Sequence, residues 1–212
     1  MTIQDLSASL HNCQRCKLGK LGRKQVVFGT GNPSASIMFV GEAPGFYEDQ
    51  QGEPFVGAAG KLLNQLLESA GLSRSQVYIA NVIKCRPPNN RDPEQDEVDT
   101  CKPFLLQQIE LIKPKLVCTL GNWATQTILE KKVGITKVKG QAINLGRFVV
   151  FPLFHPAAAL HQGNLLEPLR EDFKKLKAYL DRMNEPASSA PAATAAPASP
   201  AATQPQLDLF GS

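Results

Sequence analysis

Short apolar runs alternate along the chain with longer stretches in which apolar residues recur at helical spacing. The runs are four to six residues long and rich in Val, Ile and Leu, which predicts buried strands at 37–40, 77–82, 115–120 and 148–153. A helical stretch follows each run. The repeated strand-helix order predicts an α/β fold in three layers, with a central four-stranded parallel sheet flanked by helices.

The apolar spacing predicts five helices, and residues with known capping preferences mark several of their ends. The expected helices are one over 2–12, one that ends at Ala70 before Gly71, one that begins at Asp92-Pro93, one that begins at Gly121-Asn122 and one over about 169–184.

The composition changes abruptly after residue 185. Of the twenty residues in 186–205, nine are Ala and five are Pro, and none is charged or large and apolar. Such a segment cannot form a core, which predicts a disordered linker. The apolar cluster that follows, Gln206-Leu207-Asp208-Leu209-Phe210, is typical of a docking peptide at the end of a tether. We therefore predict a folded domain over 1–185, a linker over 186–205 and a docking segment over 206–212.

Polar residues stand where the predicted parallel strands end. The first strand runs into Gly41-Glu42-Ala43-Pro44-Gly45, Asn81 lies near the end of the second, and His155 follows the fourth. Ligands of open α/β sheets bind beyond the carboxyl ends of the strands, so these residues are candidates for one site. By itself the first loop is also typical of an ordinary tight turn. Phe55, in a Gly/Pro-rich loop, either anchors that loop or offers its ring to a planar ligand such as a base.

The charge balance is mildly basic. All 23 Lys and Arg residues and 18 of the 19 acidic residues lie within 1–185, an excess that permits contact with a polyanion without requiring it. No apolar run approaches the roughly 18 residues of a membrane span, and the N-terminus lacks the pattern of a signal peptide. We therefore expect a cytoplasmic protein without a membrane partner. Five basic residues near the N-terminus form either a solvated turn or a phosphate-facing surface: Arg15, Lys17, Lys20, Arg23 and Lys24.

Four of the five cysteines are candidate metal ligands. Cys118 falls in a predicted strand and is interpreted as a buried core residue. The others are Cys13 and Cys16 in a C-x-x-C pattern, then Cys85 and Cys101. A redox C-x-x-C pair usually follows a strand, and none is predicted here. Four thiolates fit either a structural zinc ion or a [4Fe–4S] cluster, and one pair plus two isolated cysteines, unlike the paired knuckles of a zinc ribbon, favours the cluster.

The combination of these motifs in this order resembles the family 4 uracil-DNA glycosylases over about residues 1–180. It consists of the Gly41–Gly45 loop, Pro54-Phe55, Asn81 on a strand, His155-Pro156 and the four cysteines. The resemblance implies the three-layer uracil-DNA-glycosylase-like fold and a structural [4Fe–4S] cluster on those four cysteines. It also implies hydrolysis of the N-glycosidic bond of uracil flipped out of single- or double-stranded DNA. Free uracil and an abasic site would be the products, as in base excision repair, with no cofactor in the chemistry.

The resemblance also suggests roles for the site residues. Asn81 would read uracil by donating to O4 and accepting from N3–H, an arrangement that cytosine reverses. Phe55 would stack on the flipped base, and His155 would donate a hydrogen bond to O2 as negative charge develops there. Backbone amides of the loop residues Gly41, Glu42 and Ala43 would share with His155 the stabilisation of the leaving uracil. Glu48 aligns with the family's acid beside the uracil C5 edge, where it would exclude the methyl group of thymine.

Two departures from related families bear on the mechanism. Family 1 enzymes carry an Asp at the third loop position, where this chain has Ala43. Either Glu42 activates the water, or the reaction follows a dissociative route without a dedicated base. Relatives of family X use a His nucleophile after the third-cysteine region, and 86–93 contains no His. The alternative function, from another class, is a non-enzymatic iron–sulfur module for nucleic-acid binding or electron transfer.

The terminal segment Gln206–Phe210 resembles the peptide by which bacterial DNA-processing proteins bind the sliding clamp. The expected partners are thus uracil-containing DNA and a sliding clamp. A clamp-tethered monomer, associated with the nucleoid of a bacterium, is the simplest assembly.

Overall fold

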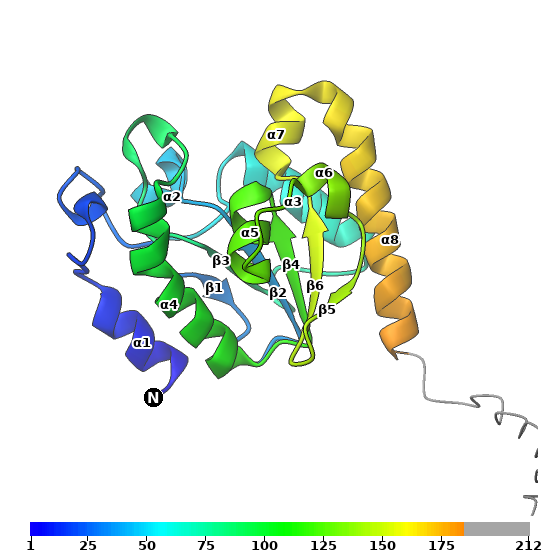
Figure 1. Cartoon of the computed structure of the whole chain (residues 1–212), viewed down its shortest axis with the longest axis horizontal. Helices are drawn as coiled ribbons and strands as arrows, with labels where there is room; N and C mark the ends of the chain where they lie inside the picture. Colours follow the sequence, from blue (N-terminus) through cyan, green and yellow to red (C-terminus); the bar gives the residue numbers. More distant parts are fainter. Residues whose placement is uncertain (185–212) are drawn as a thin grey trace, which may run out of the picture.

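A six-stranded sheet lies between helices in the computed structural model, which describes residues 1–184 (Figure 1). The strand order is β1-β3-β2-β4-β6-β5. The linker and docking segment predicted after residue 185 lie outside the described residues. The four central strands are parallel, as predicted: β2 (Ile37–Gly41), β3 (Tyr78–Asn81), β4 (Leu116–Leu120) and β6 (Val149–Leu153).

The two edge strands were not predicted. β1 (Thr30–Gly31) pairs antiparallel with β3, and β5 (Ile143–Asn144) pairs antiparallel with β6. Each contains only two residues, which is too short to show the alternation by which a strand is recognised in sequence. The prediction of a four-stranded sheet is therefore correct for the parallel centre and incomplete at the edges.

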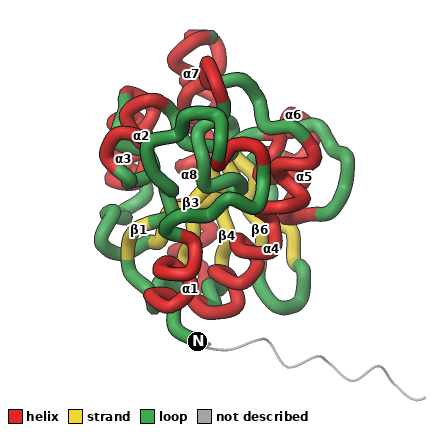
Figure 2. The backbone as a smooth tube through the Cα atoms, turned by 90° about the vertical axis from the view of Figure 1, so that its left-hand side faces the viewer, coloured by secondary structure: helices red, strands yellow, loops and turns green. Residues whose placement is uncertain are grey.

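Helices cover both faces of the sheet (Figure 2). The longer ones are α1 (Ile3–Leu10), α3 (Ala58–Ser69), α4 (Gln95–Ile112), α5 (Asn122–Leu129) and α8 (Leu166–Asn184). The short ones are α2 (Phe46–Gln51), α6 (Ile135–Val138) and α7 (Pro156–His161), with 3-10 turns η1 (Lys17–Gly19), η2 (Pro88–Asn90) and η3 (Gly163–Leu165).

Successive side chains of each strand point to opposite faces of the sheet, so a hydrophobic core lies on each face. Phe39 faces α3 and α8, where its ring stacks on Phe173 with the ring centroids 6.3 Å apart. Its neighbours Met38 and Val40 point to the other face, into the core beneath α4 and α5. The residues of β3 and β4 are all buried, because helices cover the sheet on both sides. α1 packs against the outer side of α4.

The start of α4 corrects one prediction. The helix begins at Gln95, with Glu94 as its N-cap, rather than at Asp92-Pro93. Glu94 and Glu97 form a reciprocal capping box, and the Glu97 carboxylate also accepts two hydrogen bonds from Arg91, at 2.9 and 2.6 Å. These contacts hold residues 88–93 as an ordered loop in front of the helix.

The other helix bounds differ by a few residues from those predicted. The N-terminal helix covers Ile3–Leu10, within the predicted 2–12, and the last helix begins at Leu166, three residues earlier than expected. α2, α6 and α7 were not predicted, because one or two turns are too few to establish a helical period. No helix within residues 1–184 is both long and apolar enough to cross a lipid bilayer.

Candidate active site

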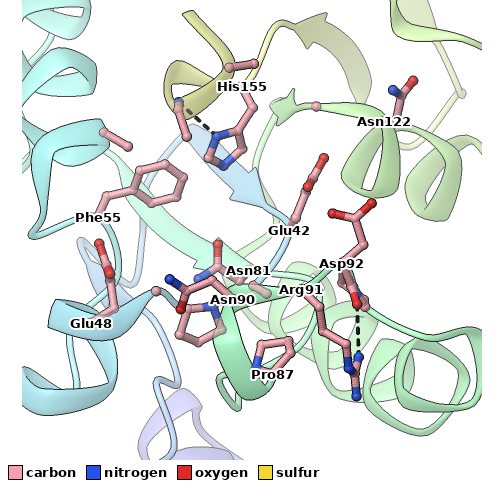
Figure 3. Close-up of a pocket in the computed structure, with 18 of the residues that line it drawn as sticks. Glu42, Glu48, Phe55, Asn81, Pro87, Asn90, Arg91, Asp92, Asn122 and His155 are labelled. Carbon is pink, nitrogen blue, oxygen red and sulfur yellow. Dashed lines mark hydrogen bonds between the residues drawn. The ribbon is translucent and has the colours of Figure 1, made fainter. Parts of the chain in front are cut away.

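A cavity of about 430 Å³ opens at the carboxyl ends of the parallel strands (Figure 3). Its walls come from the loop after β2, residues 87–93 after β3, the start of α5 and the junction of β6 with α7. The structure thus brings together side chains that are far apart in sequence. Six of the predicted site residues line this cavity: Glu42, Ala43, Glu48, Phe55, Asn81 and His155.

Asn81 lies at the end of β3, in register with Gly41 of β2. Its side chain is buried, and its Oδ1 has no hydrogen-bond partner among the residues that the structure describes. A Cβ on Gly41 would lie 2.4 Å from that oxygen and 2.7 Å from Cζ of Phe55. Gly41 therefore allows the carboxamide and the ring to meet at the strand end. Lys84 is also buried, and its Nζ donates to the main-chain oxygen of Asn81 at 2.7 Å. This hydrogen bond fixes the backbone at the end of β3.

Phe55 is held in a backbone conformation that non-glycine residues seldom adopt. Its φ angle is +56°, and its ring is buried. Arg74 fixes this turn by donating to the main-chain oxygens of Phe55 at 3.0 Å and Pro54 at 2.6 Å. The Phe55 ring lies 5.5 Å from the His155 ring, centroid to centroid, at an interplanar angle of 28°. A strained residue that is fixed so firmly is typical of a binding site.

His155 is the N-cap of α7. Its Nδ1 accepts a hydrogen bond from the backbone N–H of Ala157 at 3.1 Å. Burial lowers the pKa of His155 to about 4, so the ring is neutral at physiological pH. Because Nδ1 is the acceptor, the proton of the neutral ring is on Nε2. His155 can therefore donate a hydrogen bond into the cavity without carrying a charge.

Glu42 follows β2 and lies against the start of α5. Burial raises the pKa of Glu42 to about 7 and the charge of Asp92 adds to this rise, while backbone N–H groups at Trp123 and Asn122 oppose it. The Trp123 N–H donates to Oε1 of Glu42 at 3.4 Å. A Cβ on Gly121, whose φ is +92°, would lie only 2.1 Å from the same oxygen. The carboxyl group thus sits in a narrow space and can change its protonation state near neutral pH.

Glu48 has a clear structural contact in addition to its place on the cavity wall. Its Oε1 accepts hydrogen bonds from the backbone N–H groups of Val56 and Gly57, both at 3.1 Å. The side chain therefore ties α2 to the loop that carries Phe55. This contact does not test the predicted role of Glu48 against the thymine methyl group, which stays a prediction.

Part of the cavity wall was not identified from the sequence. Asn90, Arg91 and Asp92 come from the proline-rich loop after β3, and Asn122 from the start of α5. The sequence signal was a basic, proline-rich loop at the carboxyl end of a strand, but no single residue in it stood out. Its position depends on the Arg91 contact with Glu97, which spacing alone does not show.

The comparisons with known proteins agree with this geometry. The family model described as the Uracil DNA glycosylase superfamily matches residues 28–182. This chain belongs to that superfamily. It is 49% identical over 185 residues to a type-4 uracil-DNA glycosylase of Sulfurisphaera tokodaii, covering 83% of this chain and 84% of the relative. A type-4 uracil-DNA glycosylase of Saccharolobus solfataricus is 48% identical over 184 residues, with 82% and 85% covered. One of Thermotoga maritima is 45% identical over 184 residues, with 85% and 95% covered.

These matches confirm the resemblance to the type-4 group of the superfamily that the motifs suggested. They also explain the fold, since the mixed sheet with helices on both faces is the architecture expected for the superfamily.

The four candidate ligand cysteines of this superfamily member lie apart from the large cavity. They meet at a small cavity of about 20 Å³ between the N-terminal segment, the loop after β3 and α4. Lys84 also lines it and thus lies between the two cavities. Cys118 is buried in the sheet core, as predicted. The full lining of the small cavity is Leu10, Cys13, Cys16, Val26, Lys84, Cys85, Thr100, Cys101 and Phe104.

Proposed function

We propose that this chain is a monofunctional uracil-DNA glycosylase that binds uracil flipped out of DNA and hydrolyses its N-glycosidic bond. It releases free uracil and leaves an abasic site, the first step of base excision repair. The observation that carries the proposal is the buried Oδ1 of Asn81, which lies at the cavity beside the Phe55 ring without a partner among residues 1–184. An unpaired buried acceptor costs about 1–3 kcal/mol, so a ligand that brings an N–H donor to this point is favoured.

Uracil satisfies Asn81 and cytosine does not. Uracil N3–H donates to Oδ1 while Nδ2 of the same carboxamide donates to uracil O4. Cytosine has an acceptor at N3 and an amino group at C4, so both contacts become repulsive. The Phe55 ring stacks on the base, in the position that Arg74 fixes. All of these groups come from one chain, which supports a monomer as the catalytic unit.

His155 stabilises the leaving base. Its neutral ring keeps its proton on Nε2, and that N–H donates to uracil O2 as the glycosidic bond breaks. A fixed donor at a developing negative charge lowers the barrier without any proton transfer. The burial that keeps His155 neutral also strengthens this hydrogen bond, because little water competes for it.

Glu42 orients the attacking water. Ala43 cannot do so, and the carboxyl group of Glu42 is the nearest one along the same loop. With a pKa of about 7, Glu42 carries a substantial carboxylate fraction at neutral pH and can accept a proton from water. The same negative charge favours the cationic sugar that forms as uracil departs.

A [4Fe–4S] cluster held by Cys13, Cys16, Cys85 and Cys101 is the proposed metal group, because all four cysteines line the small cavity. One C-x-x-C pair plus two isolated cysteines is unlike the paired knuckles of a zinc ribbon, which favours the cluster over a zinc ion. The buried Lys84 offsets the negative charge of four thiolates. Such a cluster would join the N-terminal segment to α4 and to the loop after β3, the strand that carries Asn81. Iron and sulfide analysis with an anaerobic optical spectrum tests this.

The C-terminal segment Gln206–Phe210 lies outside the described residues, and its proposed partner is a bacterial sliding clamp. Its composition and its place after a twenty-residue Ala/Pro-rich segment support this partner. Docking there would keep the catalytic domain near replicating nucleoid DNA. Deletion of 206–210 should abolish co-purification with the clamp and leave excision from short oligonucleotides unchanged; loss of excision as well would refute the docking role.

The activity itself is tested with a uracil-containing oligonucleotide. After incubation with the protein, hot alkali should cleave the strand at the uracil position, and free uracil should be released in equal amount. An oligonucleotide with thymine at that position is the control and should stay intact. No cleavage by protein that retains its full complement of iron would refute the proposed function.

A further inference from the structure

The short helix α2 has its polar and apolar sides reversed. Asp49 is 2% exposed, whereas Phe46 is 48% exposed and Tyr47 is 59% exposed. A surface helix normally buries its aromatic side chains and exposes its acids. Two adjacent, exposed aromatic rings are unfavourable in water, so their position calls for a binding role.

The acids of α2 explain why the helix is held in this orientation. The Asp49 carboxylate accepts hydrogen bonds from the backbone N–H of Lys24 at 3.0 and 3.1 Å. Glu48 accepts from the backbone of Val56 and Gly57, as described above. Both contacts fix the inner face of α2 to the protein, and the rings are left on the outer face.

The Phe46 and Tyr47 rings do not line the large cavity, but the residues on either side of them do. Gly45 and Glu48, which flank Phe46 and Tyr47 in the sequence, both line the cavity. The Tyr47 ring lies beside Gly57, in the loop that carries Phe55. α2 and α7 lie at the same end of the sheet, where the strands point (Figure 1). A DNA strand that delivers a base into the cavity must therefore pass close to α2.

Arg86 completes the arrangement. Its guanidinium carbon lies 5.0 Å from the centroid of the Phe46 ring, and its Nε donates to Oδ1 of Asn90 at 2.6 Å. Asn90 lines the cavity, so Arg86 spans from the cavity wall to α2. The Phe46 and Tyr47 rings meet edge to face, 5.4 Å apart at 84°. Their faces point in different directions, and the Arg86 guanidinium lies over the Phe46 ring.

We propose that Phe46, with Tyr47 edge-on to it and Arg86 over its ring, forms a platform on which the base next to the flipped uracil stacks in single-stranded DNA. This inference rests on the proposed function and extends it from the uracil pocket to a neighbouring nucleotide. Exposed aromatic rings bind unpaired bases regardless of sequence, and an adjacent arginine contacts the phosphate or stacks on the base. Exposed aromatic rings alone would also suit a protein partner. The positively charged guanidinium of Arg86 next to the rings favours a nucleic acid strand, which is negatively charged.

The test measures excision of uracil from three single-stranded oligonucleotides. One has bases on both sides of the uracil, and the other two carry an abasic tetrahydrofuran residue on the 5′ or the 3′ side. Phe46→Ala and Tyr47→Ala should each lower kcat/KM on the first substrate by about fivefold or more. On the substrate that lacks the stacked base, the two variants should match the wild type, because the ring then has no base to contact. The ring substitution and the missing base thus form a double-mutant cycle. Leu145→Ala, at an exposed site in the turn between β5 and β6, is the control and should match the wild type on all three.

Further variants separate stacking from folding. Tyr47→Phe keeps a ring and should retain wild-type activity, whereas Phe46→Leu keeps apolar bulk and should behave like Phe46→Ala. Inhibition by free uracil should be the same in all of these proteins, because the pocket itself is unchanged. Equal losses on the three substrates, no loss on any, or full activity of Phe46→Leu would each overturn the platform.

Failure of the platform can be distinguished from failure of the proposed function. If the wild-type protein excised uracil from none of the oligonucleotides, the proposed function would be refuted. The platform is then tested by binding alone, with 2-aminopurine as the base beside the uracil. Its fluorescence should be quenched on binding to the wild-type protein and not on binding to Phe46→Ala; equal quenching by both would overturn the inference.

Discussion

Glu42→Gln keeps the size of the side chain and an acceptor for the Trp123 N–H, and it removes the charge. With a pKa of about 7, about 1% of Glu42 is ionised at pH 5, half at pH 7 and about 90% at pH 8. If the carboxylate orients the water, wild-type kcat/KM rises about tenfold per pH unit up to pH 7 and then levels off. The Gln variant should show no such rise, and at pH 8 its kcat/KM should be about 10² to 10⁴ times lower than that of the wild type.

Asp92→Asn provides a control that moves the midpoint of the profile instead of abolishing it. The charge of Asp92 contributes to the raised pKa of Glu42, so its removal should shift the midpoint to lower pH. His155 does not interfere with this measurement, because its pKa of about 4 keeps it neutral from pH 5 upward. Single-turnover excision rates from pH 5 to 9 would give both midpoints.

The ionisation of Glu42 should also lower the stability of the fold. The unfolded chain releases this proton near its ordinary value of 4.5 and the folded chain near 7, so the native state binds more protons between these values. The free energy of unfolding therefore falls as pH rises through this window, by up to about 3 kcal/mol. Urea denaturation should show Glu42→Gln to be more stable than the wild type at pH 8 and similar to it at pH 4.

Two results would refute this reasoning about Glu42. One is a Gln variant with wild-type kcat/KM at pH 8, which would favour the dissociative route without a dedicated base. The other is a flat wild-type profile between pH 5 and 8.

Three further substitutions test the base-reading end of the sheet and the loop beside it. Asn81→Asp should lower kcat/KM for uracil by about 100-fold, because a carboxylate cannot donate to O4, and should permit some release of cytosine; unaltered uracil excision would show that Asn81 does not read the base. Gly41→Ala should reduce kcat/KM at least tenfold in a folded protein, since its Cβ would displace the Asn81 side chain and the Phe55 ring; a crystal structure of an active variant with both groups unmoved would contradict this. Glu97→Ala should lower the free energy of unfolding by about 2–4 kcal/mol, measured by urea denaturation, because it removes the capping box and the partner of Arg91; a change below about 0.5 kcal/mol would contradict the importance of these contacts.

The sequence predicted the parallel centre of the fold because those strands are long enough to show a pattern. It also predicted that Glu42, Asn81 and His155 would lie close together, since the carboxyl ends of parallel strands share one edge of the sheet. The two-residue edge strands and the short helices α2 and α7 carry too few residues for any period to emerge.

Other features of the site depend on contacts between distant residues. The loop that contributes Asp92 is placed by the contact of Arg91 with Glu97, and the start of α4 moves with it. The neutral state of His155 and the raised pKa of Glu42 follow from burial, which depends on the whole fold. The reversed faces of α2 depend on backbone N–H groups that donate to its carboxylates, Asp49 and Glu48. The order of side chains in the sequence does not show where these backbone groups lie.

The capping of α7 by His155 bears on the proton balance of the reaction. If Nδ1 of His155 carried a proton, this N–H would face the backbone N–H of Ala157, and neither group could accept a hydrogen bond. The start of α7 therefore disfavours the imidazolium form of His155. In the proposed mechanism the enzyme therefore ends the chemical step in the protonation state in which it began, apart from the proton that Glu42 takes from water. The base leaves the sugar as an anion and becomes neutral only when solvent or Glu42 supplies a proton. If solvent supplies this proton, it enters by the route through which the product leaves; if Glu42 supplies it, the Glu42 carboxylate is restored within the cavity.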